Sequence, residues 1–260
     1  FYADNCTTRA GKIIASHSSS LQIDNILPNP PPTYRQMIHI YLERQQQYWP
    51  EFGIDMLLGA NLDQKPSNEQ AMYFLPDYLM NGFDHAHTGT GPLVRKKETL
   101  LQFPETKTGV AWFTPSLFFG LLILLSVILT LKKKRPAQKA LQIFDILLFS
   151  LLGLIGLIML YVWIFRVDEV CRNNINIFWA LPTHLAAVFF LRKNPSWLKY
   201  YFLATAAVAA ILLIGFVWWP QQMNSAVAAL LVLVIFRSFH QFKKLSNAKV
   251  RTVPAAKPRI

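Results

Sequence analysis

The chain has 260 residues, of which 53% are hydrophobic and 15% are charged, and its formal net charge is +12. Residues 1–110 carry nine basic and eleven acidic side chains, whereas residues 111–260 carry seventeen basic and only three acidic ones. The positive charge lies in the half with the long apolar runs, which argues against a nucleic-acid-binding protein, and the high apolar content without a heptad or glycine period excludes disorder and rod-like folds. This composition predicts a soluble head, residues 1–108, a membrane domain, residues 109–242, and a basic tail, residues 243–260.

A helix is predicted at the start of the head, with Cys6 in its first turn. Asp4 or Asn5 is a suitable N-cap, and Cys6 is followed by small and apolar residues at helical spacing, so that its side chain should face inward. Free backbone amides and the positive end of the helix dipole favour the thiolate, which is the nucleophilic form of a cysteine. Cys6 is thus a candidate nucleophile, although a core role is more common for an isolated buried cysteine.

No histidine of the head is well placed to act as the base for Cys6. His17 lies eleven residues further along the same helix, about 16 Å away by helical rise, and His39 falls inside a second predicted helix, residues 34–48. The Asp-His-Ala-His run at residues 84–87 lacks the further ligands that a zinc site needs and is predicted to be a loop. We therefore expect no metal and no cofactor, and we expect the base in an upstream part of a longer protein.

The rest of the head is predicted to alternate linkers with short elements. Residues 21–33 are proline-rich and extended, and residues 93–103 have strand-like character. Ser67 and Gln70 have capping-box spacing at the start of a further helix. Together with the first two helices, these elements predict a mostly helical α+β head.

Five apolar segments in the second half are predicted to cross a membrane. About 20 residues span the hydrocarbon core, and each span must be helical because lipid offers no partners for backbone amides. The approximate ranges are 110–131, 140–165, 175–191, 197–219 and 223–239. Asp145 and Arg237 lie near the ends of the second and fifth segments and are expected to reach the interface. An all-α bundle of five transmembrane helices is therefore expected.

The loops between these segments predict the orientation. The loops after the first and third segments and the chain after the fifth, counted with Lys199 and Arg237 at the adjoining segment ends, carry fifteen basic and no acidic residues. Residues 166–174 and 220–222 carry only two basic ones. The positive-inside rule then places the basic segments and the C-terminus in the cytoplasm and the head on the opposite side. Five tryptophans fall at the outer ends of segments, as in an aromatic belt: Trp112, Trp163, Trp179, Trp218 and Trp219.

Several stretches of the sequence form specific motifs. In the head these are FYADNCTTR at residues 1–9, TYRQ at 33–36, WPEFGIDMLLG at 49–59 and FLPDYL at 74–79. In the membrane half, a further motif is NINIFWALPTH at residues 174–184, at the outer end of a span. Together these stretches resemble the Lnb-type lipoprotein N-acyltransferase family, and the resemblance covers nearly the whole chain.

The resemblance implies a periplasmic head related to permuted NlpC-type papain-like folds, in which the catalytic histidine precedes the cysteine. It implies that Cys6 is the nucleophile, that Asp4, Asn5 and Arg9 are its surroundings, and that this chain without the histidine is an inactive fragment. The implied reaction moves a fatty acyl chain through a cysteine thioester to the N-terminal amine of a lipoprotein, at the outer leaflet of the bacterial inner membrane. Lipoprotein and phospholipid are the implied partners, and no nucleic acid is expected.

Polar residues inside a membrane span are costly and are often functional. Asn176 and His184 lie near the outer end of the third segment, where they could line a lipid-access groove or form hydrogen bonds between helices. With Asn174 and Trp179 of the same stretch, they are candidates for a membrane mouth.

Three other possibilities remain open. A membrane-tethered cysteine amidase or peptidase that acts on cell-wall peptides would use the same nucleophile. A membrane scaffold would instead keep Cys6 buried and inert. A disulfide between Cys6 and Cys171, which are predicted on the same side of the membrane, would remove the nucleophile.

Overall fold

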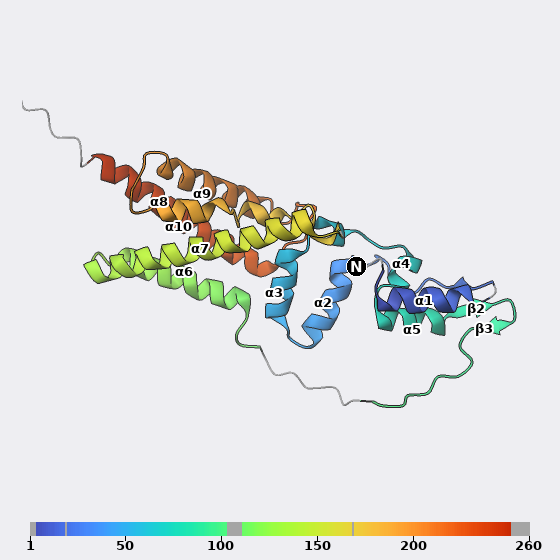
Figure 1. Cartoon of the computed structure of the whole chain (residues 1–260). Helices are drawn as coiled ribbons and strands as arrows, with labels where there is room; N and C mark the ends of the chain where they lie inside the picture. The colour runs from blue at the N-terminus through green and yellow to red at the C-terminus, as the bar shows by residue number, and fades with distance from the viewer. Residues whose placement is uncertain (1–3, 19, 103–110, 168, 251–260) are drawn as a thin grey trace, which may run out of the picture. The chain divides into compact units, whose positions relative to one another are not determined.

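The structure is a computed structural model that describes residues 4–18, 20–102, 111–167 and 169–250 (Figure 1). By their internal contacts the residues form two compact units. The first unit comprises Phe1–Gln47 and Asn61–Ala111, and the second comprises Tyr48–Ala60 and Trp112–Ile260. Residues 48–60, which lie within the head expected from the sequence, thus cluster with the second unit.

The first unit consists of helices and three short strands. Its elements are α1 (Cys6–Ser16), β1 (Gln22–Ile23), α2 (Tyr34–Arg44), most of the 3₁₀ turn η1 (Ala60–Asp63), α4 (Asn68–Met72), α5 (Pro76–Asp84), β2 (Ala86–Thr88) and β3 (Gly91–Pro92). The strands form an antiparallel sheet in the order β1–β2–β3, with Gln22 opposite His87 and His87 opposite Pro92. Strands of this length cannot form a core, so the helices dominate the unit.

Local sequence signals explain where these helices begin. The side chain of Asn5 caps α1. Thr33 and Ser67 cap α2 and α4, and in both cases a glutamine, Gln36 or Gln70, completes a capping box. The capping box predicted at Ser67 is confirmed.

The interior of the first unit combines small hydrophobic clusters with a buried ion pair. One cluster includes Met37 of α2, and another includes Phe83 of α5. Arg35 donates from Nε to Asp63 Oδ1 at 2.8 Å and from Nη2 to Oδ2 at 3.1 Å. Both side chains are buried, so this paired geometry offsets the cost of removing two charges from water.

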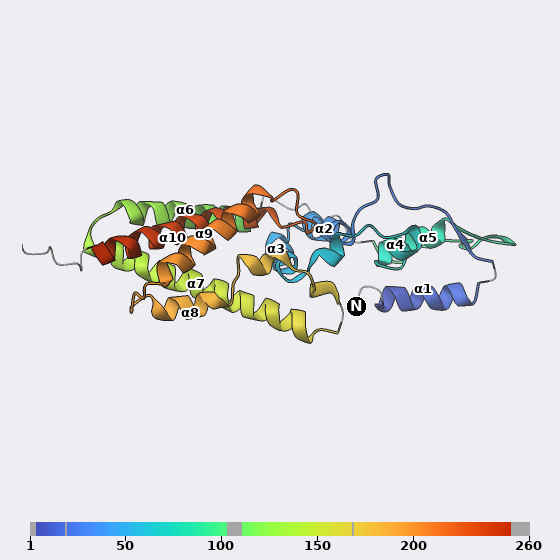
Figure 2. The same ribbon diagram turned by 90° about the horizontal axis from the view of Figure 1, so that it is seen from above.

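The second unit is helical. Its elements are α3 (Tyr48–Leu57), α6 (Pro115–Leu131), α7 (Arg135–Phe165), the 3₁₀ turns η2 (Glu169–Cys171) and η3 (Ile175–Phe178), α8 (Thr183–Phe190), α9 (Leu198–Ile214) and α10 (Ser225–Val250). Figures 1 and 2 show α6, α7, α9 and α10 running alongside one another. Among the described helices, Arg135–Phe165 and Ser225–Asn247 are long and apolar enough to cross a membrane.

The third apolar segment is broken where one continuous helix was expected. The chain forms η3, turns at residues 179–182, and then forms α8, which has 8 residues. Eight helical residues rise about 12 Å, which is less than half of the hydrocarbon thickness. Pro182 stands at the start of α8, where its missing amide donor and fixed φ are compatible with a helix start but not with a helix interior.

Glycine permits α7 to pack closely against this broken segment. A Cβ at Gly156 would lie 1.7 Å from the carbonyl oxygen of Ala180, and a Cβ at Gly153 would lie 2.8 Å from the side chain of Leu185. Only glycine fits at both positions without movement of the neighbouring chain. Close approach at small residues is typical of helix packing in membranes.

Asp145 and Arg237 are buried against each other, so the expectation that they reach the interface is wrong. Arg237 donates from Nε to Asp145 Oδ1 at 2.7 Å and from Nη2 to Oδ2 at 2.8 Å, and neither side chain is more than 1% exposed. Arg237 also donates to Thr130, and Gln241 donates to Asp145. The physical reason is that pairing satisfies both charges between α6, α7 and α10, which removes the need for either to leave the bundle.

Three smaller expectations also differ from the structure. Within residues 93–102 the structure has no strand, and residue 103 lies outside the described ranges. The run at residues 84–87 is not only a loop, because it contributes to β2. Trp179 is 1% exposed and cannot belong to an aromatic belt, whereas Trp112 and Trp218 are largely exposed.

Candidate functional site

Helix α1 presents Cys6 as its first residue. Asn5 precedes it in an extended conformation, and the side-chain oxygen of Asn5 accepts a hydrogen bond from the amide of Thr8 at 2.9 Å. The prediction that Cys6 lies in the first turn of a helix is confirmed. The prediction that its side chain faces inward is wrong, because Cys6 is exposed.

The inward face of α1 is formed by Thr8 and Gly11 instead. Thr8 Oγ1 donates to the carbonyl oxygen of Tyr73 at 3.0 Å. The backbone at Gly11 approaches the ring of Tyr73 so closely that a Cβ would lie 2.3 Å from it. Cys6 and Thr8 are two residues apart and point in nearly opposite directions on a helix, so the anchoring of Thr8 turns Cys6 outward.

Asn5 has a second contact that fixes the helix start. Its Nδ2 donates to the carbonyl oxygen of Phe74 at 2.9 Å, while its side-chain oxygen caps α1. Asn5 therefore positions the first turn against the segment between α4 and α5. This gives Asn5, predicted as part of the surroundings of Cys6, a defined structural task.

Arg9 supplies a positive charge on the same helix face as Cys6, since residues three apart are neighbours on a helix. Arg9 Nε and Nη2 donate to Asp4 Oδ1 and Oδ2 at 3.1 and 2.8 Å. This hydrogen bond lowers the pKa of the Asp4 carboxyl and raises the pKa of the Arg9 guanidinium, to which Cys6 adds a smaller contribution. The pair is exposed and therefore adds little to stability.

Cys6 has no hydrogen-bond partner within the described parts of the chain, and neither cysteine forms a disulfide. His17 stands at the C-cap of α1, where its Nδ1 contacts the carbonyl oxygen of Ile13 at 2.8 Å. Cys171 is buried in the second unit. The structure therefore leaves the Cys6 thiol accessible and assigns it no base among the residues that it describes.

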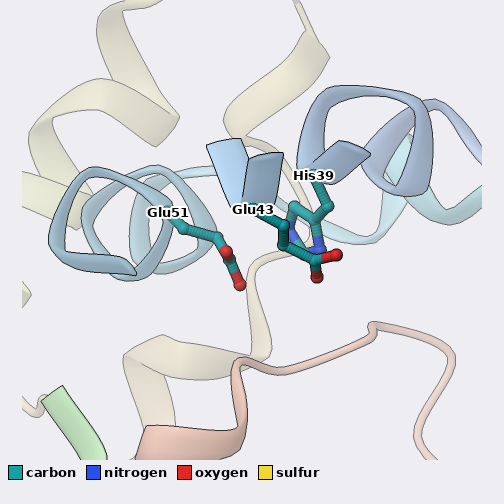
Figure 3. Close-up of side chains that lie close together, drawn as sticks. All are labelled: His39, Glu43 and Glu51. Carbon is teal, nitrogen blue, oxygen red and sulfur yellow. The ribbon is translucent and has the colours of Figure 1, made fainter. Parts of the chain in front are cut away.

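Figure 3 shows three side chains that can bind metals in other proteins. His39 and Glu43 lie one turn apart on α2 of the first unit. Glu51 belongs to α3 of the second unit, where its Oε1 accepts a hydrogen bond from Asn224 at 3.3 Å. Two ligands at this spacing on one helix are common without a metal, and we assign no metal site to them.

The four predicted membrane-mouth residues are buried, and two of them, Asn174 and Asn176, bind helix α3. Asn174, Asn176 and Gln221 donate to carbonyl oxygens in or just after the last turn of α3, at 2.7, 3.0 and 3.0 Å. The last carbonyls of a helix have no partners within the helix, so these three amides complete its C-terminal end. Asn224 Nδ2 also donates to Asp55 Oδ2 of α3, at 2.9 Å.

Trp179 and His184 extend the same hydrogen-bonded network. Trp179 Nε1 donates to Asn176 Oδ1 at 2.9 Å. His184 Nε2 lies 3.2 Å from the carbonyl oxygen of Trp179, and its Nδ1 lies 2.6 Å from the hydroxyl of Tyr201. None of the four predicted residues is more than 3% exposed. Their hydrogen bonds lie within the unit, as expected if these residues link helices to one another. A lipid-binding role for them stays a prediction.

Replacing Asn176 with leucine is expected to lower the free energy of unfolding by about 2–4 kcal/mol. The variant leaves the carbonyl of Asp55 and the indole N–H of Trp179 buried without their partner, and each such group costs about 1–3 kcal/mol. Thermal unfolding in detergent measures the loss. Asn247, exposed on α10, is the matched control, and its leucine variant should change stability by no more than about 0.5 kcal/mol. Equal effects of the two variants would contradict the role of Asn176.

Sequence reasoning missed the polar partners of α3. Gln221 lies between the fourth and fifth apolar segments and Asn224 lies at the start of the fifth, while Asp55 lies in a stretch predicted to be part of the head. The available signal was the spacing of Glu51 and Asp55, which places two acidic groups on one face of a helix that is otherwise apolar. Such a face needs polar partners when the helix is packed among apolar ones.

A comparison with protein families gives independent information on the second unit. A family model for the Lnb transmembrane domain matches residues 105–248, which is more than half of the chain. The chain belongs to the Lnb family. No curated protein and no solved structure matches it.

The Lnb match covers α6 to α9 and most of α10. It confirms the predicted family and supports a membrane protein with a membrane-associated role of the lipoprotein N-acyltransferase type. The match does not include α1 with Cys6 or α3. The match therefore gives no information on the chemistry of the head.

Proposed function

We propose that this Lnb-family protein is a membrane-anchored acyltransferase that moves a fatty acyl chain to the N-terminal amine of lipoproteins. The Lnb transmembrane domain at residues 105–248 is the observation that carries the proposal. The exposed thiol at the start of α1 supports it, because acyl transfer through a thioester needs an accessible nucleophile.

The proposed reaction has two steps. The Cys6 thiolate attacks an ester carbonyl of a phospholipid or of a diacylglyceryl group; the C–O bond breaks, and the leaving alcohol takes a proton. The resulting thioester is attacked by the neutral α-amine of the lipoprotein, which forms an amide and returns the thiol. Thioesters and esters have comparable energies and thioesters react readily with amines, so a thiol suits this exchange.

The surroundings of Cys6 support the first step. Cys6 lies at the positive end of the α1 dipole, and the Arg9 guanidinium lies on the same helix face. Asp4 orients Arg9, and Asn5 fixes the helix start. We propose in addition that the head has a permuted papain-like fold, in which a histidine that precedes the cysteine in the chain is the general base.

The proposal also includes the topology predicted from charge. The head, residues 1–108, lies on the periplasmic side of the bacterial inner membrane; a membrane domain of five spans follows over residues 109–242; and the basic tail, residues 243–260, lies in the cytoplasm. This arrangement places the thiol on the side where the acyl chains of the outer leaflet and lipidated substrates are found, so that enzyme and substrates meet by diffusion in two dimensions.

The test is expression of the full-length protein in a host that lacks its own lipoprotein N-acyltransferase. The mass of a lipoprotein's N-terminal peptide should increase by one amide-linked acyl chain. If the protein is present and folded but the peptide gains no acyl chain, the proposal is wrong. Release of cell-wall peptides under the same conditions would then indicate the amidase or peptidase, and inactivity with unreactive Cys6 would indicate a scaffold.

A further inference from the structure

The second unit contains an apolar cavity of about 550 Å³. Its walls come from α3, α6, α7 and α10, and every lining residue is a hydrophobic side chain or Gly53. Ordered water needs two to four polar partners, which such a wall does not offer. The cavity therefore suits an apolar occupant.

One wall of the cavity follows α7 over several turns. The lining residues of this helix begin at Phe144 and end at Ile155 and recur at intervals of three and four, so that they form one stripe. Eleven residues of helical rise correspond to about 16 Å. This wall is long enough for an extended chain to lie along it.

The wall also reaches the outer surface of the unit. Leu147 and Leu151 of the stripe are 64% and 57% exposed, whereas Leu148 and Leu152, one position further along, are buried. In a membrane domain, an exposed leucine on a long apolar helix faces lipid. The cavity thus connects the lipid-facing surface of α7 with the interior of the unit.

Helix α3 separates this cavity from the polar network. Trp49, Phe52, Gly53 and Met56 face the cavity. Elsewhere on the same helix, Asp55 is bound by Asn224 and the C-terminal carbonyls are bound by buried amides. An apolar cavity beside polar side chains suits a lipid, in which an apolar acyl chain is attached to a polar ester group.

We propose that this cavity holds one acyl chain of a membrane phospholipid and presents that lipid as the acyl donor. An extended peptide segment would place unpaired backbone amides against an apolar wall, whereas an acyl chain has no polar groups to satisfy. The assignment as donor rests on the function proposed above, whereas the binding of a chain does not.

The experiment uses phosphatidylethanolamine with a photoactivatable diazirine in one acyl chain. The full-length protein in phospholipid vesicles is irradiated, and cross-linked peptides are located by mass spectrometry. We expect labels on the lining residues of α3, α6 and α7, for example at Met56 and Leu148. Labels confined to other surfaces would overturn the proposal.

Substitutions at Gly53 test the cavity itself. A Cβ at Gly53 meets nothing within 4 Å, so Gly53→Ala fits without displacing the backbone, and Gly53→Leu adds a larger apolar side chain to the wall of the cavity. Labelling should fall slightly in Gly53→Ala and at least about fivefold in Gly53→Leu. Gly120 of α6 also has open space around it and does not line the cavity, so Gly120→Leu should label like the unmodified protein. Undiminished labelling of Gly53→Leu would overturn the proposal.

The same measurement separates this proposal from the proposed function. Cys6→Ala should bind and cross-link the lipid like the unmodified protein, because the cavity does not use the thiol. If the unmodified protein fails to acylate lipoproteins but is labelled in the cavity, the enzyme proposal fails and the chain-binding site stands. If it acylates lipoproteins while Gly53→Leu is labelled normally, the binding site fails and the enzyme proposal stands.

Discussion

Replacing Cys6 with alanine is expected to abolish transfer of acyl chains to lipoprotein amines, with a rate loss of at least about a thousandfold. The reason is that both proposed steps pass through the Cys6 sulfur, while the other thiol, that of Cys171, is buried in the second unit. The variant should fold normally because Cys6 is exposed and makes no hydrogen bond with the described residues. The rate is measured by mass spectrometry of the lipoprotein's N-terminal peptide over time.

The other cysteine provides the control for this prediction. Cys171→Ala should retain most of the activity, since Cys171 is buried in the second unit and has no part in the proposed chemistry. Cys6→Ser should lose nearly as much activity as Cys6→Ala, because a hydroxyl is far less acidic than a thiol and forms a much weaker nucleophile at this position. Full activity in Cys6→Ala would move the chemistry away from α1.

Breaking the buried ion pair of the second unit is expected to cause the largest loss of stability. Asp145→Leu alone or Arg237→Met alone should lower the free energy of unfolding by about 3–5 kcal/mol, because each leaves the other charge buried without its partner. Unfolding of the purified protein in mixed micelles, followed by its intrinsic fluorescence, measures the loss.

The double variant Asp145→Leu, Arg237→Met should regain most of that stability, since apolar side chains of similar size can replace a buried pair at little cost. Arg172 and Glu169 form an exposed ion pair in the same unit, at 2.9 Å. Glu169→Gln is therefore the matched control, with an expected change of less than about 1 kcal/mol. A double variant as unstable as the single ones would contradict the account of this pair.

The start of α1 shows what local patterns can and cannot predict. The capping preference of Asn5 was sufficient to place Cys6 in the first turn of a helix, because capping depends on a few neighbouring residues. The direction of the Cys6 side chain was predicted wrongly, because it depends on where Thr8 and Gly11 meet the segment that contains Tyr73. That contact is separated by more than sixty residues in the chain and leaves no periodic signal.

In the membrane half, too, local patterns predict some features, whereas others depend on contacts between distant residues. Apolar length predicted α7 well and the start of α10, but α10 continues to Val250, well beyond the segment expected to end near residue 239. It did not predict the interruption before α8, although Pro182 was a visible signal for one. Nor did it pair Asp145 with Arg237, because two charges more than ninety residues apart can be matched only when the packing of the helices is known.

Residues 49–59 are the clearest case of a segment whose place depends on tertiary structure. Their sequence resembles the head motifs of the family, yet the last turn of α3 is completed by Asn174, Asn176 and Gln221 of the second unit. A helix that satisfies its terminal carbonyls with side chains from elsewhere carries no local signature of that partnership. The apolar cavity lined by Gly53 was unpredictable for the same reason.

The most direct test of the central claim, that Cys6 carries the acyl group, is the mass of the peptide that contains it. The full-length protein is incubated with phospholipid and without a lipoprotein acceptor, quenched in acid and digested. The Cys6 peptide should gain the mass of one acyl chain, and neutral hydroxylamine should remove that mass, as expected of a thioester. An unmodified Cys6 peptide from a preparation that transfers acyl chains to lipoproteins would contradict the claim.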